Sequence, residues 1–233
     1  MDMPGFGGSP PLPPGTEASP AELARAVAAF VREEVGPDPI EVGGHSLGGW
    51  TALELAKLGV ARRVTAVAPA GFWRGWEGDY ARTLLKLTAW SARSQGAVLE
   101  AGFRRPRARV ALAAGQFGFP ERVTADALRR MFATLRDATG FDEALAAATQ
   151  RRFEGGESID VPVTVLWGTR DGLLLPRQAK RVRQELPEAE LIMVPHAGHF
   201  AHWDDPDATM RALLRQDEPG RDPLPLAPPN VPR

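Results

Sequence analysis

The chain of 233 residues contains no cysteine. This absence excludes disulfide bonds, catalysis by a thiolate and metal sites that are ligated by cysteine. No apolar run is long enough to span a bilayer, and the first residues lack the basic region followed by an apolar stretch that marks a signal peptide. We therefore expect a cytoplasmic protein without a membrane span.

Excess charge is also absent, because the formal net charge at pH 7 is −1. No overall field would then attract nucleic acid or anionic lipid. Hydrophobic residues make up 43% of the chain and charged residues 24%, as in an ordinary globular protein. The length allows one substantial core, or one core plus a small accessory subdomain. We expect a small-molecule partner and no nucleic acid; the oligomeric state is left open.

Two parts of the chain alternate predicted strands with predicted helices. Ser19-Pro20-Ala21-Glu22 predicts a helix start, with serine as the N-cap and proline at the first helical position. The first part then gives a strand at 40–43, a helix at 47–58 and a strand at 64–68. Strand, helix and strand in so few residues indicate a right-handed crossover in a parallel sheet. The second part gives strands at 161–167 and 189–194, and helices at 176–186 and 207–215.

Between these parts, residues 72–158 show no strand pattern but predict helices at 79–99, 121–134 and 141–151. We therefore predict an α/β fold, with a mostly parallel sheet, flanking helices and a helical insertion. Its predicted divisions are a core at 1–71, the insertion at 72–158, the rest of the core at 159–216 and a disordered proline-rich tail at 217–233.

Gly44-His45-Ser46-Leu47-Gly48 lies between a predicted strand and a predicted helix. A serine hydroxyl is a nucleophile at neutral pH only when a base takes its proton. A sharp strand-to-helix turn presents the hydroxyl to both base and substrate, and small residues on either side permit that turn. The helix start also directs the Leu47 N–H at any oxyanion formed at Ser46, so Leu47 is the predicted oxyanion-hole donor.

Four motifs extend this pattern over nearly the whole chain, except for the insertion and the tail. They are Val42-Gly43-Gly44-His45-Ser46-Leu47-Gly48-Gly49, Asp2-Met3-Pro4-Gly5-Phe6-Gly7-Gly8-Ser9, Trp167-Gly168-Thr169-Arg170-Asp171 and Ala197-Gly198-His199-Phe200. The first resembles the nucleophile elbow of the α/β-hydrolase superfamily, and the second resembles the loop after that family's fourth strand. The third and fourth resemble the loops that carry the triad acid and the triad base.

The resemblance implies a catalytic triad of Ser46, Asp171 and His199, in the chain order that this fold uses. Glu77 or Asp79 is an alternative acid, because some members of the family place it after the sixth strand. Members similar to epoxide hydrolases have aspartate as the nucleophile, so a serine implies acyl chemistry instead.

Two other histidines compete with His199 for the role of base. His196 follows a predicted strand end and fits local packing better, whereas His202 could line the substrate pocket. The three histidines, with Asp204 and Asp205 nearby, also allow a metal site. The resemblance accounts for His199 without a metal, and we expect neither a metal nor another cofactor.

The resemblance identifies the insertion as a lid or cap over the nucleophile. Most of its aromatic residues should form its own core, and a few should face Ser46. The predicted substrate-binding residues are His45, Trp73, Trp76, Phe119 and His202. One dense basic run is Arg104-Arg105-Pro106-Arg107-Ala108-Arg109. It predicts a solvent-exposed helix start, and contact with an anionic substrate is the alternative.

The first strands of the family core have no counterpart here, so the predicted fold is truncated at its N-terminus. A misplaced start codon, a truncated gene and a degenerate family member are the three explanations. The missing part includes the third strand and the loop that supplies a second oxyanion donor. The strand at 40–43 would then be an open edge. We expect the chain by itself to be poorly soluble or weakly active. Adding an upstream in-frame segment should restore both its solubility and its catalytic rate.

The leading functional hypothesis is a hydrolase of carboxylic esters or related acyl bonds in small, partly apolar substrates, acting through an acyl-enzyme. One alternative is a non-hydrolytic binder of small molecules with the same fold. Another is an acyltransferase or perhydrolase, which uses the same residues with a different acceptor.

Overall fold

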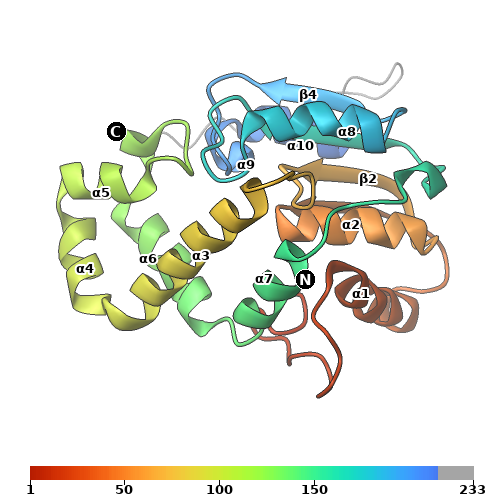
Figure 1. The fold of residues 1–233 in the computed structure, drawn as a ribbon, viewed down its shortest axis with the longest axis horizontal. Helices are drawn as coiled ribbons and strands as arrows, with labels where there is room; N and C mark the ends of the chain where they lie inside the picture. The colour runs from red at the N-terminus through yellow and green to blue at the C-terminus, as the bar shows by residue number, and fades with distance from the viewer. Residues whose placement is uncertain (215–233) are drawn as a thin grey trace.

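Parallel strands form the sheet that supports the molecule (Figure 1). The computed structural model describes residues 1–214, so the tail predicted at 217–233 lies outside the described residues. Within residues 1–214 the sheet has four strands in the order β1-β2-β3-β4, and each adjacent pair is parallel. The strands are β1 (Ile40–His45), β2 (Ala61–Val67), β3 (Val163–Gly168) and β4 (Glu190–Val194). The prediction of a mostly parallel sheet is confirmed.

Burial differs between the middle and the edge of this sheet. Every residue of β3 is buried, because strands flank β3 on both sides and helices cover both sheet faces. In contrast, β1 pairs only with β2 among the described residues and alternates between exposed and half-buried positions. The other edge of β1 therefore offers N–H and C=O groups that no described strand uses.

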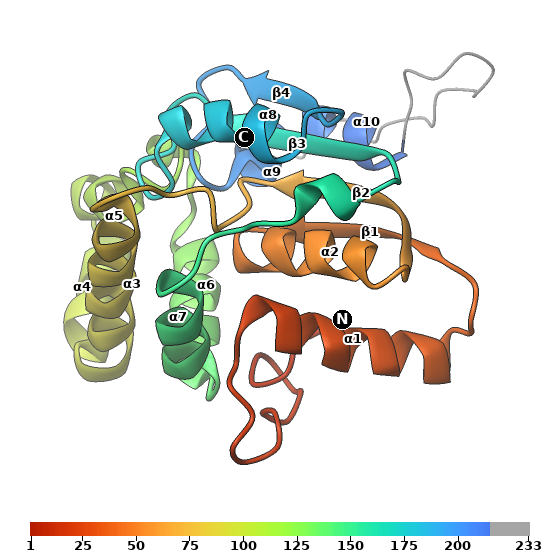
Figure 2. The same ribbon diagram turned by 45° about the vertical axis from the view of Figure 1, so that its right-hand side comes forward.

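Helices cover the two faces of the sheet (Figures 1 and 2). On one face lie α1 (Pro20–Glu34), α2 (Leu47–Lys57) and α8 (Ala179–Glu185); on the other lie α9 (Ala201–Asp204) and α10 (Pro206–Leu214). As predicted, Ser19 caps α1, and its hydroxyl accepts a hydrogen bond from the Glu22 N–H at 3.3 Å. Trp50 and Leu53 of α2 and Trp167 of β3 belong to the largest core cluster of the described residues.

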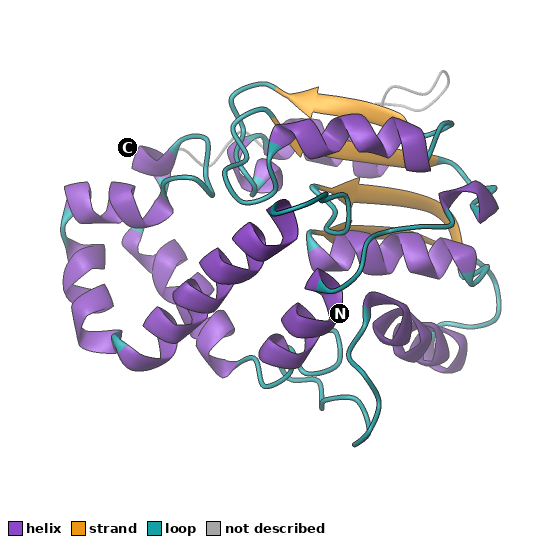
Figure 3. Cartoon of the chain, in the orientation of Figure 1, coloured by secondary structure: helices purple, strands orange, loops and turns teal. Residues whose placement is uncertain are grey.

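The remaining helices stand beside the carboxyl end of the sheet, as Figures 2 and 3 show. They are α3 (Glu77–Ser94), α4 (Gly96–Arg104), α5 (Pro106–Ala113), α6 (Ala125–Asp137) and α7 (Phe141–Thr149). This helical segment has a core of its own that includes Phe103, Leu128 and Phe132. Within residues 1–214, no helix has both the length and the hydropathy that crossing a membrane requires.

Two of the helices predicted in this segment differ from the prediction by more than small shifts at their ends. The helix expected at 79–99 is divided, because Gln95 leaves helical geometry with φ −118° and ψ 28°. The helix expected from residue 121 begins at Ala125. The preceding Pro120–Arg122 forms a 3₁₀ turn, and the Thr124 hydroxyl then caps α6 by accepting the Ala127 N–H.

Candidate active site

Ser46 occupies the turn between β1 and α2, with φ 55° and ψ −117°. This conformation is costly for a residue other than glycine. The turn is also very tight, because a Cβ atom on Gly44 would lie 2.1 Å from the Gly48 carbonyl oxygen. The Gly-x-Ser-x-Gly spacing thus gives a strand-to-helix turn that holds Ser46 at the end of the sheet.

Leu47 is the first residue of α2. The N–H groups in the first turn of a helix have no acceptor within that helix, and they lie at the positive end of its dipole. The Leu47 N–H is therefore a donor next to Ser46 that has no acceptor within α2.

Asp171 and His199 form a buried pair, each 2% exposed. The His199 Nδ1 atom lies 2.9 Å from Asp171 Oδ2. The other carboxylate oxygen, Asp171 Oδ1, accepts the N–H groups of Leu173 and Leu174 at 2.9 and 2.8 Å. With both oxygens engaged, Asp171 has a fixed orientation, and a proton on Nδ1 leaves Nε2 of His199 free to act as a base.

Ser46 and His199 line one cavity of about 370 Å³. Within residues 1–214 their side chains form no hydrogen bond with each other. Bonds between a nucleophile and its base are often long without substrate and tighten in the complex, so this geometry is compatible with proton transfer.

Asp204 connects the loop of His199 to the helical segment. Its Oδ2 atom accepts the N–H groups of Gly118 and Gly198, both at 2.8 Å, and Oδ1 accepts that of Phe119 at 3.3 Å. From its position in the sequence, Asp204 suggested only a neighbour of a histidine metal site. Among residues 1–214, no group of three or more histidine or acidic side chains is placed to hold a metal ion.

The other three histidines differ in their surroundings. His45 Nε2 donates to the His199 carbonyl oxygen at 2.9 Å, and the His45 ring packs 4.8 Å from that of His202. Burial, and then the proximity of His199 and His202, lowers the pKa of His45 well below its ordinary value. Burial also lowers the pKa of His202. His196 is exposed and its backbone N–H donates to the Thr169 hydroxyl at 2.8 Å.

Replacing His45 with glutamine is expected to weaken the acid sensitivity of folding. Because the pKa of His45 is lowered in the folded state, the unfolded chain binds a proton that the folded chain does not, once the pH falls below about 6.5. Stability is therefore lost as the pH falls, by up to about 1.4 kcal/mol per pH unit for one proton. Urea unfolding between pH 7.5 and 4.5 measures this slope. The exposed control His196→Asn should keep the full slope, and equal slopes in both variants would refute the explanation.

Glu77, considered above as an alternative acid, is engaged elsewhere. Its buried carboxylate pairs with Arg177 and Arg181 and accepts the Arg74 N–H at 2.8 Å. Burial alone would raise the pKa of Glu77, but the hydrogen bonds from these three residues outweigh it and hold that pKa below its ordinary value. Glu77 thus fixes the start of α3 to α8, and Asp79 is exposed.

The walls of the cavity beside Ser46 are mainly apolar and come mostly from the helical segment. α3 contributes Leu85 and Thr88, and α6 contributes Met131, Phe132, Thr134 and Leu135. Of the five predicted substrate-binding residues, only His45 lines this cavity. These α6 residues were missed because apolar spacing on a helix does not reveal which neighbour it faces.

The other four predicted residues lie elsewhere. Trp73 is buried against Trp50, with its indole N–H on the Arg151 carbonyl oxygen at 2.7 Å. Trp76 is exposed, Phe119 packs under the Arg122 guanidinium, and His202 contacts His45 behind the cavity wall.

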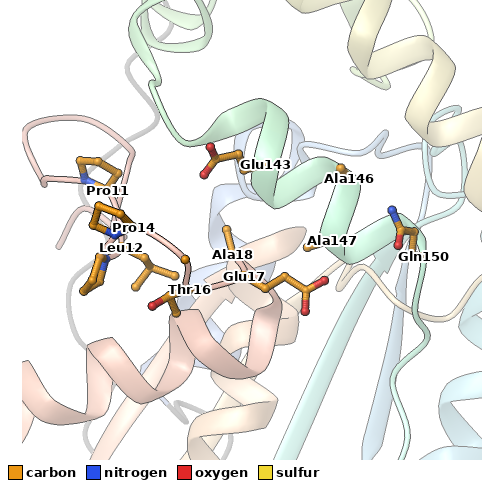
Figure 4. Close-up of a pocket in the computed structure, with 12 residues that line it drawn as sticks. Pro11, Leu12, Pro14, Thr16, Glu17, Ala18, Glu143, Ala146, Ala147 and Gln150 are labelled. Carbon is orange, nitrogen blue, oxygen red and sulfur yellow. The ribbon is translucent and has the colours of Figure 1, made fainter.

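A second hollow of about 630 Å³ lies between the N-terminal loop and α7 (Figure 4). Pro11, Pro14 and Leu12 line one side of it, and Glu143 and Gln150 the other. No serine or histidine lines this hollow, so it lacks the two residue types that line the cavity beside Ser46 together.

The chain is similar in sequence and in fold to known proteins. The model of a family described as alpha/beta hydrolase fold matches residues 1–206. A solved thermophilic esterase from Thermogutta terrifontis superposes with a TM-score of 0.66 at 19% identity, covering 92% of this chain and 76% of the esterase. At that identity the likeness concerns the fold.

Two curated proteins are similar in sequence. The dihydrolipoyllysine-residue acetyltransferase component of the acetoin cleaving system of Cupriavidus necator is 30% identical over 229 residues, which are 93% of this chain and 54% of that protein. Epoxide hydrolase EphH of Mycobacterium tuberculosis is 50% identical over 44 residues, which are 19% of this chain and 21% of that protein. The chain therefore spans about half of the first relative's length, and the stretch that matches the second relative covers about a fifth of it.

Proposed function

Since this chain belongs to the alpha/beta hydrolase fold family, we propose that it hydrolyses carboxylic esters of small, partly apolar substrates through a covalent acyl-enzyme on Ser46. One observation carries the proposal. The buried Asp171–His199 pair opens on the same cavity as Ser46, which is held in a strained turn. Strain and a buried histidine–carboxylate pair often mark a catalytic site.

In the proposed reaction, Ser46 Oγ attacks the ester carbonyl while His199 Nε2 takes its proton. The Leu47 N–H donates to the oxyanion of the tetrahedral intermediate. His199 then returns the proton to the departing alcohol, and a water molecule releases the acid by the same steps. Asp171 stabilises the imidazolium and holds its orientation.

The lining of the cavity supports a neutral, largely apolar acyl group. Apart from the histidines, its polar residues are the uncharged Ser46, Thr88, Gln116 and Thr134, and no Asp, Glu, Lys or Arg belongs to it. Burying a charged substrate group there would cost free energy, because no opposite charge would compensate for its lost hydration.

Reaction with a p-nitrophenyl ester tests the proposal. We expect a burst of nitrophenol close to the enzyme concentration and a mass increase of one acyl group on the peptide that contains Ser46. A binder without hydrolytic chemistry would give neither. Acylation of any other residue would also reject the assignment of the nucleophile.

Acyl transfer is a second candidate function, favoured by the similarity to an acetyltransferase component. The acyl-enzyme would be the same, but a thiol such as dihydrolipoamide would replace water as the acceptor. Adding that thiol to the burst assay should shift the product from acid to thioester if transfer dominates. An unchanged yield of acid would show that water, and not the thiol, is the acceptor, so hydrolysis would remain the proposed function.

We also propose that residues 72–158 act as a cap that selects substrates. Leu85→Ala is expected to enlarge the cavity and to favour esters with longer acyl chains by about 1–3 kcal/mol in kcat/KM. Its matched control is Leu87→Ala, on the same helix but 57% exposed, which should leave the chain-length profile unchanged. An equal loss of kcat/KM for every ester in the Leu85 variant would contradict the proposal that this side of the cavity selects substrates.

A further inference from the structure

The outer face of α3 carries an exposed apolar stripe. Trp76, Tyr80, Leu87 and Trp90, here called the outer stripe, are 58, 36, 57 and 54% exposed. With about 3.6 residues per helical turn, these four side chains fall within an arc of about 80°. A surface helix normally presents polar residues on this face, so the outer stripe is a candidate interaction surface.

The packing of α3 does not account for this stripe. The opposite face of the helix buries Ala81, Ala89 and Ala92 and contributes Leu85 and Thr88 to the cavity beside Ser46. That face already attaches α3 to the rest of the molecule. Folding of the described chain therefore leaves the outer stripe uncovered.

One end of the stripe is held rigidly in place. The Arg177 guanidinium lies 4.8 Å from the centre of the Trp76 ring, and the Tyr80 hydroxyl donates to the Gly172 carbonyl oxygen at 2.7 Å. The two aromatic rings pack edge to face, with centres 5.7 Å apart. Rings already fixed in this way lose little conformational freedom when they bind a partner.

Basic side chains flank the stripe on one side of α3. At about 100° per residue, Arg82 and Lys86 lie on that side together with the acidic Asp79. Arg82 and Lys86 are on α3 itself, and Arg105 and Arg107 follow at the junction of α4 and α5. Within residues 1–214, none of these four forms an ion pair.

We propose that the outer stripe binds an anionic lipid surface. Tryptophan, tyrosine and leucine suit the boundary between head groups and acyl chains, and nearby arginine and lysine attract anionic head groups. A second copy of the chain is a less favourable partner, because it offers fewer anionic groups to Arg82 and Lys86 than an anionic lipid surface does. The proposal is independent of the ester chemistry proposed above.

Flotation with lipid vesicles tests this surface, using the full chain. We expect binding to vesicles of phosphatidylcholine with 30% phosphatidylglycerol, little binding to phosphatidylcholine alone, and a decrease with added salt. The double variant L87Q/W90Q should reduce the bound fraction about tenfold, because binding scales with the apolar area that is inserted. Circular dichroism checks that the variant is folded.

The matched control is Trp203→Gln, on α9, because Trp203 is also exposed at 47%. Its binding should equal that of the unaltered protein, and Lys86→Glu should weaken binding without loss of folding. The proposal is overturned if the anionic vesicles do not bind the protein, or if L87Q/W90Q binds as well as Trp203→Gln. It is also overturned if gel filtration shows a dimer that L87Q/W90Q dissociates while lipid binding is absent.

Discussion

Replacing Ser46 with alanine is expected to reduce kcat for ester hydrolysis by on the order of 10⁶. The variant has no hydroxyl to form the acyl-enzyme, so only unassisted attack by water remains. Initial rates and the nitrophenol burst, measured at equal protein concentration, give the size of the loss. Activity within tenfold of the unaltered protein would reject Ser46 as the nucleophile.

Two further variants separate lost chemistry from lost structure. Ser94→Ala, at an exposed position on α3, should retain full activity. Ser46→Gly should be as inactive as Ser46→Ala but more stable by about 1 kcal/mol, because glycine tolerates φ 55° without strain. Thermal unfolding measures this difference. A glycine variant that is less stable would show that Ser46 is not strained.

Asp171→Asn is expected to lower kcat by about 10⁴. The asparagine oxygen can still accept the N–H groups of Leu173 and Leu174, so its NH₂ group would face His199 Nδ1. That nitrogen would then have to accept a hydrogen bond, which moves the histidine proton to Nε2. In this tautomer His199 cannot take the proton from Ser46, although the geometry is unchanged.

The matching histidine variants identify the base. His199→Ala should lose nearly as much activity as Ser46→Ala, whereas His196→Asn should stay within a few-fold of the unaltered protein. Circular dichroism and rates with the same ester provide the comparison. An inactive His196 variant beside an active His199 variant would overturn the choice of base, and full activity in Asp171→Asn would remove Asp171 from the mechanism.

The sequence was sufficient to predict those features of the fold that depend on contacts between neighbouring residues. The helix start at Ser19 depends on atoms three residues apart, and the turn at Ser46 depends on the absence of a side chain at Gly44. The alternation of strands and helices was enough to predict parallel pairing, because a short crossover permits little else. These predictions agree with the structure, apart from shifts of a few residues at element ends.

The residues that line the cavity could not be predicted from local sequence. Trp73 and Trp76 precede α3 and are large and apolar, yet one is buried against Trp50 and the other faces outward. Leu85 and Met131 line the cavity from different helices, 46 positions apart in the chain. Which side of a helix meets the cavity depends on how α3 and α6 are placed against the sheet.

The sequence by itself determined the α/β class, the parallel strands and the tight turn that presents Ser46, because each follows from steric rules over a few neighbouring residues. It also named Asp171 and His199 through resemblance, but it contained no distance between them. Only the tertiary structure brought these two side chains to 2.9 Å, engaged Glu77 with arginines and left one face of α3 uncovered. The physical reason is that such contacts depend on the packing of segments far apart in the chain.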